Sequence, residues 1–106
     1  MTDALIVLTT YPDQETALKA ASKLVREKLA ACVNVLPQMT SVYEWRGEAK
    51  TDREHLLIAK TTLRRFAALE TAIVDTHPYE LPEIIATPIA QGLKDYLKWI
   101  DAQTTP

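Results

Sequence analysis

Short apolar runs alternate with amphipathic segments along this chain and divide it into a simple order of strands and helices. The run ALIVLTT, residues 4–10, is apolar and rich in β-branched residues, which predicts a buried strand. Asp13 follows as a helix N-cap, with Glu15 in the first turn, where the helix dipole favours an anion. Apolar residues then recur at helical spacing as far as Leu29, so we expect one amphipathic helix here.

The middle of the chain has a strand pattern. ACVNVLP (residues 31–37) predicts a strand that Pro37 closes, TSVYEW (40–45) follows as a strand-like stretch that reaches Trp45, and RGEAKTD (46–52) predicts a turn region. REHLLIAKTT (53–62) then alternates, with Leu56, Ile58 and Lys60 on one face and Leu57, Ala59 and Thr61 on the other. Since both faces carry aliphatic side chains, we expect this strand to be covered on both sides.

The last third repeats the helix-to-strand order. Residues 63–75 have helical periodicity, and HPYELP (77–82) ends that helix because a residue that precedes proline disfavours helical conformation. EIIATPI (83–89) predicts a fourth strand, and LKDYLKWIDA (93–102) predicts a short final helix.

The predicted order is β-α-β-β-α-β followed by a C-terminal helix. It indicates an α+β fold, a ferredoxin-like sandwich with the helices on one face of the sheet, in one domain over residues 1–106. A strand that is apolar on both sides in such a fold predicts that other subunits cover the second face. We therefore expect a homo-oligomer.

The net charge and the cysteine count limit the partners and the cellular compartment that we expect for this protein. Lys and Arg number 12 against 14 Asp and Glu, so we expect no nucleic acid and no membrane as partners. The single cysteine, Cys32, excludes an internal disulfide and is expected to be a small buried hydrophobic residue. The N-terminus lacks the features of a secretory signal, which predicts a soluble, cytoplasmic protein.

This sequence lacks the residues that several known functions of ferredoxin-like domains require. The segment after the first strand reads TTYPDQ, without the C-x-x-C pair of a metallochaperone or the glycine and arginine of a phosphoryl-binding loop. The central strands carry no aromatic residues for RNA stacking. We find no Ser/His/Asp set and no paired carboxylates beside a base, so an enzyme is not expected.

The remaining candidates are polar residues near the HPYELP segment. His77 either hydrogen-bonds to nearby backbone or ligates a metal, and the first interpretation is favoured. Lys60 interrupts an apolar strand face, with Glu54 and Glu83 as candidate counter-charges. Trp45 and other aromatic residues either form subunit contacts or line a pocket.

Five stretches together resemble the CutA family, the divalent-cation tolerance proteins: LAACVNVLP, SVYEWRG, LLIAKTT, HPYELPEIIATPI and DYLKWI. They occur in the right order and spacing over almost the whole chain. The resemblance implies a ferredoxin-like subunit in a tight, PII-like homotrimer, in which edge strands of neighbouring subunits pair and the hairpin around Trp45 reaches across.

The resemblance implies that copper binding, where some members of the family show it, uses a cysteine near the end of the first strand and two adjacent histidines. Here these positions read Thr9 and Thr76-His77, so His77 is the one metal ligand that the resemblance implies. A single imidazole predicts at most weak binding of copper or another divalent cation.

Three hypotheses follow for function. The first is a homotrimeric CutA-type protein that responds to metal ions. The second is a PII-like sensor whose ligand binds at subunit interfaces, in a pocket made by Trp45, Glu54, Lys60, Tyr79 and Glu83. The third is a scaffold for protein interactions.

Overall fold

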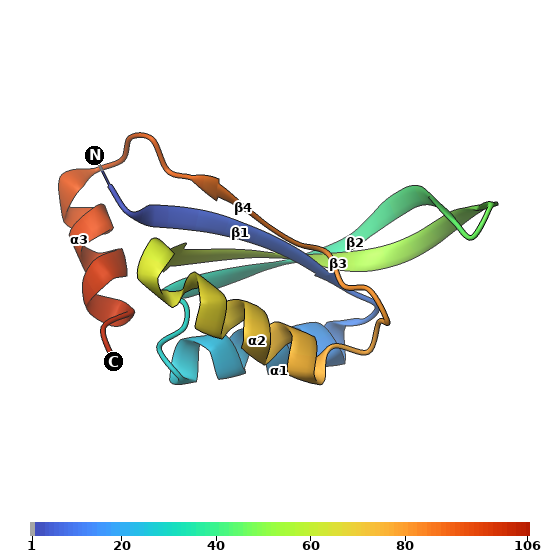
Figure 1. Ribbon diagram of the computed structural model, residues 1–106, viewed down its shortest axis with the longest axis horizontal. Coiled ribbons are helices and arrows are strands. Elements are labelled where there is room, and N and C mark those ends of the chain that lie inside the picture. The colour runs from blue at the N-terminus through green and yellow to red at the C-terminus, as the bar shows by residue number, and fades with distance from the viewer. Residues whose placement is uncertain (1) are drawn as a thin grey trace.

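The computed structural model describes residues 2–106, and its elements follow one another in the predicted order (Figure 1). The strands and helices are β1 Ala4–Tyr11, α1 Gln14–Arg26, β2 Cys32–Trp45, β3 Glu48–Thr62, α2 Phe66–Thr76, β4 Ile84–Pro88 and α3 Lys94–Gln103. A 3₁₀ turn, Leu63–Arg65, joins β3 to α2, so the predicted second helix begins three residues later than expected.

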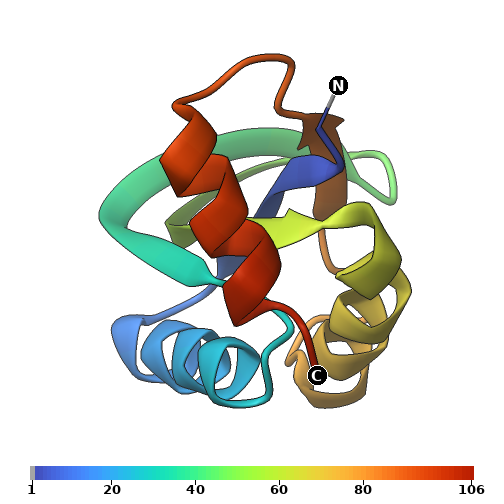
Figure 2. The same cartoon turned by 90° about the vertical axis from the view of Figure 1, so that its left-hand side faces the viewer.

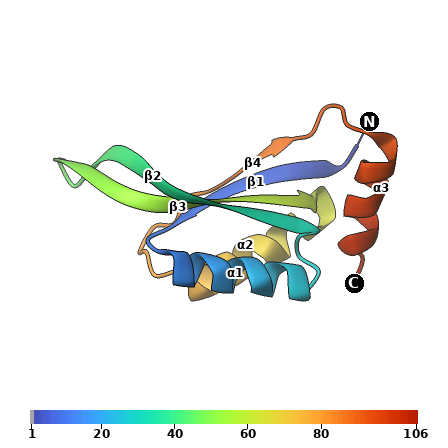
Figure 3. The same ribbon diagram turned by 180° about the vertical axis from the view of Figure 1, so that it is seen from behind.

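The strands form one antiparallel sheet in the order β2-β3-β1-β4. Helices α1 and α2 lie side by side on one face of this sheet, as Figures 1 and 3 both show. This arrangement confirms the predicted ferredoxin-like sandwich.

Helix α1 starts where the sequence predicts. The Asp13 side chain accepts a hydrogen bond from the Thr16 backbone N–H at 2.8 Å, which satisfies one of the free donors of the first turn. The helix then buries Ala17, Ala21 and Leu24 against the sheet.

The main core lies between the sheet and its two helices. Val7 of β1 and Ala59 of β3 are fully buried there, and they pack in one cluster with Leu24, Leu69 and Ile73 from the helices. Leu57 and Thr61, two residues on either side of Ala59, are also fully buried, which confirms the predicted inner face of β3.

The outer face of the sheet is apolar as well, but no helix of residues 2–106 covers it (Figure 2). Leu56 and Ile58 are half-buried there, while Leu36 and Ile85 keep 40% and 54% of their surface exposed. The predicted alternation of β3 is therefore confirmed, and one of its faces remains open in the single chain.

Two predictions about the middle of the chain were wrong. The strand predicted to close at Pro37 continues instead through residues 40–45 as one strand, β2, and a register irregularity between Leu36 and Met39 accommodates Pro37. Because β2 is an edge strand, a proline can face solvent without breaking the ladder. The turn is also shorter than expected, since Arg46 and Gly47 alone make it, with φ of 53° and 80°, as in a type I′ hairpin.

The β2–β3 hairpin extends beyond the rest of the sheet. Strand β1 pairs with β3 only from His55 onward, so residues 48–54 pair with β2 alone. This two-stranded extension gives the molecule its elongated shape, 44 × 25 × 23 Å (Figure 1).

Helix α3 crosses the opposite end of the sheet (Figure 2). Ile100 is fully buried against Ala4 and Ala31, and the Arg64 guanidinium donates to the Asp101 carboxylate at 2.8 Å. Within the described residues, no helix is both long enough and apolar enough to cross a membrane.

Candidate functional site

A cleft of about 700 Å³ lies between the protruding hairpin and the loop that follows α2. The hairpin contributes Ser41, Val42, Tyr43, Trp45 and Glu54, and the loop contributes Pro78, Tyr79, Glu80, Leu81 and Glu83. The structure thus brings together four of the five residues predicted to form a ligand pocket: Trp45, Glu54, Tyr79 and Glu83.

Glu54 lies at the base of the hairpin, where β3 leaves the main sheet. The residue has only 7% of its surface exposed, and Tyr79 donates its phenolic hydrogen to Glu54 Oε2 at 2.7 Å. Burial, followed by the Glu54 carboxylate, raises the pKa of Tyr79 above its ordinary value. The phenol therefore stays protonated and holds the loop against the hairpin.

His77 fixes the start of the same loop. Because Pro78 follows it, His77 leaves the helix with an extended backbone, φ −72° and ψ 137°. Its ring Nε2 lies 2.7 Å from the carbonyl oxygen of Thr10, and its Nδ1 accepts the Tyr79 backbone N–H at 3.0 Å. The ring also lies between Tyr11 and Tyr79, with centroid distances of 4.3 and 4.8 Å.

These two hydrogen bonds determine which nitrogen of the His77 ring carries the proton. Since Nδ1 accepts from Tyr79 and a carbonyl can only accept, the proton must be on Nε2, which donates to Thr10. Burial lowers the pKa of His77 below its ordinary value, against the opposing effects of Thr10 and Glu54, and this favours the neutral ring. A metal ion could bind His77 only by displacing one of the two hydrogen bonds.

The hairpin side of the cleft is aromatic. Tyr43 donates its hydroxyl hydrogen to Asp52 across the hairpin, and this hydrogen bond raises the pKa of the phenol. Trp45 is half-buried, and the guanidinium carbon of Arg46 lies 5.5 Å from the centre of its ring. Both rings line the cleft.

The rim of the cleft carries more acidic side chains. Glu80 is exposed and pairs with Arg46 at 3.1 Å, which links the loop to the hairpin tip. Glu83 also lines the cleft. No lysine, arginine or histidine is among the described residues that line it.

Lys60, the fifth predicted pocket residue, does not line this cleft. It lies six residues from Glu54 along β3, about 20 Å away at the rise of an extended strand. There its ammonium group donates to the Asn34 side chain on β2, and Cys32 is its cross-strand neighbour. Lys60 and Glu54 are therefore not a charge pair within one chain.

The positions that the resemblance relates to copper ligands are Thr9, Thr76 and His77. Thr9 is fully buried in β1, and Thr76, in the last turn of α2, donates its hydroxyl hydrogen to the Ala72 carbonyl oxygen. Within residues 2–106 no group of three or more histidine, cysteine or acidic side chains is arranged to hold a metal ion. Metal ligation by His77 stays a prediction.

Two parts of this site were not predicted from the sequence. One is Tyr11, whose ring supports His77; its hydroxyl is buried with no hydrogen-bond partner among the described atoms, and burial raises its pKa to about 12. The other is the Tyr43–Asp52 pair. The signal for this pair was the two-residue turn at Arg46-Gly47. With that turn, Asp52 lies opposite Ser41 and diagonal to Tyr43, within reach of its side chain.

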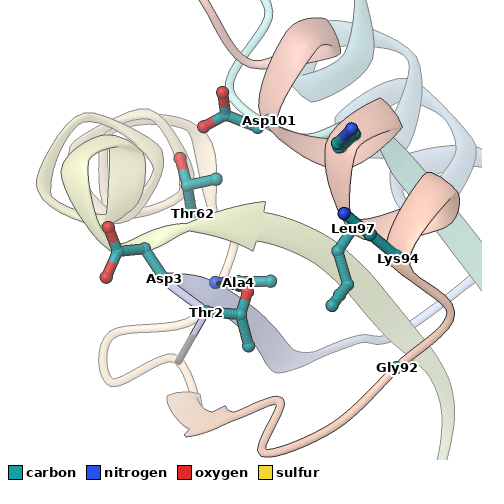
Figure 4. A pocket seen from close by; sticks show the side chains of 9 residues that line it. Thr2, Asp3, Ala4, Thr62, Gly92, Lys94, Leu97 and Asp101 are labelled. Atoms are coloured by element: carbon teal, nitrogen blue, oxygen red, sulfur yellow. Dashed lines mark hydrogen bonds between the residues drawn. The ribbon is translucent and has the colours of Figure 1, made fainter.

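A second cavity, of about 450 Å³, lies at the other end of the molecule (Figure 4). It is bounded by the start of β1, the end of β3 and helix α3, with Asp3, Thr62, Lys94 and Asp101 on its walls (Figure 4). No site was predicted here from the sequence.

Comparisons with known proteins agree on one family. The profile described as "CutA1 divalent ion tolerance protein" matches residues 5–103. A protein of Thermus thermophilus named "Divalent-cation tolerance protein CutA" is 48% identical over 99 residues, which cover 93% of this chain and 96% of that protein. "Protein CutA, chloroplastic" of Arabidopsis thaliana is 43% identical over 101 residues, covering 95% of this chain but 56% of that longer protein.

Solved structures give the same result. The structure of "Divalent cation tolerance protein (Cut A1)" from Thermus thermophilus superposes with a TM-score of 0.94 at 46% identity, covering 96% of this chain and 99% of the other. The family is described by ion tolerance and not by a reaction. The profile over residues 5–103, the near half-identity and the shared fold together show that this chain belongs to the CutA1 divalent ion tolerance family.

Proposed function

We propose that this protein acts in divalent-ion tolerance as a homotrimer. The observation that carries the trimer is the uncovered outer face of the sheet, where apolar side chains such as Leu36 and Ile85 remain exposed. An apolar surface of this kind on a soluble domain marks a protein contact, and the same surface on identical chains gives a closed, symmetric assembly.

The hairpin supports the same proposal. Residues 48–54 pair with β2 alone, and an isolated two-stranded ribbon is marginally stable in water. Val42 at this extension keeps 75% of its surface exposed and Tyr43 keeps 43%. Contact with a neighbouring subunit would bury these side chains and stabilise the ribbon.

Within this proposal, copper or another divalent cation binds at most weakly to a single subunit. His77 is the imidazole that the family pattern leaves, and both of its nitrogens already take part in hydrogen bonds. Stronger binding would need ligands from more than one subunit. In this proposal, metal binding therefore depends on the assembly of subunits as much as on any single ligand.

Native mass spectrometry of the metal-free protein, and then of the protein with copper or zinc added, tests both parts. We expect a trimer that takes up few ions, with less uptake in His77→Ala and unchanged uptake in His55→Ala, the matched control for the other histidine. A monomer at micromolar concentration would refute the assembly. Equal uptake by His77→Ala and the unsubstituted protein would refute the ligand assignment.

A second candidate function is the binding of a small molecule, and the cleft favours it. Its volume of about 700 Å³ is in the range of ligand sites, and the nearly buried Glu54 supplies a fixed polar group among aromatic walls. A ligand that binds only the folded protein raises its melting temperature. A metabolite screen by thermal shift tests this, and the absence of any rise would count against it.

A further inference from the structure

We propose that a bulge at Pro37 and Gln38 divides the outer edge of β2 into two short segments, so that a strand of another chain cannot pair along the whole edge. The bulge thereby keeps association of chains through the sheet closed and prevents open-ended stacking. This inference goes beyond the proposed function, because it concerns what stops association and holds for a closed assembly of any number of subunits.

The register between β2 and β3 identifies the bulge. Strand β2 has two residues, Pro37 and Gln38, between its ladder residues Leu36 and Met39, whereas β3 has only His55 at that place. One extra residue in one strand of an antiparallel pair is a β-bulge, which bends the strand and interrupts its hydrogen-bond ladder. The bulge lies where the protruding hairpin leaves the main sheet, since β1 pairs with β3 only from His55 onward (Figure 1).

The backbone of the bulge is strained. Gln38 has a φ of 37°, which lies in the left-handed region that residues with side chains disfavour and glycine adopts freely. Pro37 has no backbone N–H and cannot donate a ladder hydrogen bond. Both residues are exposed, so packing in a core does not explain them. Strain of this kind points to a role beyond packing, and at a sheet edge a bulge with a proline blocks strand addition.

The sheet needs such protection because a single chain leaves it open. Its outer face is apolar, and Leu36 of β2 and Ile85 of β4 are exposed on the two edge strands. Strand β2 is 14 residues long, and a long edge strand beside an apolar surface is a template for the addition of further chains. The bulge reduces the uninterrupted edge to residues 32–36 and 39–45.

The opposite edge of the sheet is limited in a similar way. Strand β4 has 5 residues, and its last residue is Pro88. Short edge strands and prolines are two further devices that prevent edge-to-edge pairing. Because an open-ended stack needs both edges of every chain to accept a neighbour, interruption of the long edge is enough to stop it. The two edges together therefore favour a finite assembly.

Removal of the bulge tests this inference. In the bulge-free variant, Gln38 is deleted and Pro37→Thr supplies the missing N–H, so that β2 and β3 can pair residue for residue. We expect its mean molar mass, measured by light scattering after size-exclusion chromatography, to exceed that of the unsubstituted protein and to rise with protein concentration. Pro37→Thr alone and Gln38→Gly both keep the extra residue, and we expect neither to change the mass.

Further variants separate strand pairing from unfolding. Thr40→Lys, added to the bulge-free variant, places a charge on the exposed edge strand, and we expect it to return the mass to that of the unsubstituted protein. Ile100→Ala weakens the fold beneath α3 and keeps the bulge, so we expect no change in its mass. Gln38→Val disfavours the left-handed backbone without shortening the chain, and we expect a smaller rise in mass.

Each outcome decides for or against the role of the bulge. A bulge-free variant with the mass of the unsubstituted protein would overturn it, and so would an equal rise in mass in Ile100→Ala or no effect of Thr40→Lys. If the deletion prevents folding, an unchanged mass in Gln38→Val overturns it. The mass of the unsubstituted protein tests the homotrimer separately, since a monomer would refute the trimer while a rise in mass on removal of the bulge would still support this inference.

Discussion

His77 should stabilise the loop that forms one wall of the cleft, and His77→Ala measures by how much. The substitution removes the hydrogen bonds of 2.7 Å to the Thr10 carbonyl and 3.0 Å from the Tyr79 N–H, each worth about 1 kcal/mol. It also removes the ring stacked on Tyr11 at 4.3 Å, worth about 1 kcal/mol. We therefore expect the free energy of unfolding to fall by about 3 kcal/mol.

Urea denaturation at pH 7.5 is the assay, at one fixed protein concentration because the stability of an oligomer depends on it. Tyr11→Phe is the matched control: it keeps the ring beneath His77 and removes a buried hydroxyl that has no partner among the described atoms. We expect that variant to be as stable as the unsubstituted protein or slightly more stable. A loss below about 1 kcal/mol in His77→Ala would refute the role of these contacts.

The result also affects how metal experiments are interpreted. If His77→Ala unfolds more easily, lower metal tolerance in that variant does not by itself demonstrate ligation. Ion uptake must then be measured under conditions in which the variant is folded.

Three further predictions concern pH and packing. Because the pKa of His77 is lowered in the folded protein, the unfolded chain binds a proton more readily at this histidine. The contribution of neutral His77 to stability is therefore complete above pH 6.5 and is lost as the pH falls below 6.5 and through the folded-state pKa. Thermal melts between pH 7.5 and 5 should show a smaller drop in melting temperature for His77→Ala than for the unsubstituted protein, and an equal drop would contradict this cause. Thr9→Val replaces a fully buried hydroxyl that lacks a partner among the described atoms, so urea denaturation should show a gain of about 1 kcal/mol; a decrease would mean that the hydroxyl has a partner such as bound water. Ile100→Ala opens a cavity beneath α3 and should lower the free energy of unfolding by about 3 kcal/mol. Amide hydrogen exchange should become faster in α3 alone, and exchange that stays slow would show that the Arg64 contacts alone hold this helix.

Much of the fold follows from the sequence because local signals and the hydrophobic pattern agree. The Asp13 cap, the alternation through Leu57 and Ala59 and the proline after His77 each specify a local conformation that the tertiary structure keeps. The break expected at Pro37 was wrong because the effect of a proline on a strand depends on whether that strand lies at an edge. Strand order is a tertiary property, so the local pattern could not reveal it.

The site shows the same division. The sequence singled out Glu54, Tyr79 and His77 as chemically notable, but spacing alone did not show that Tyr79 donates to Glu54 or that both nitrogens of His77 are engaged. Lys60 and Glu54 share a face of β3, but six residues of extended strand keep them too far apart to pair. By itself the sequence determined the order of elements, the buried face of each and the family. The tertiary structure alone decided which polar groups meet, because such contacts join residues far apart in the chain and depend on how the hairpin, the sheet edge and the loop pack together.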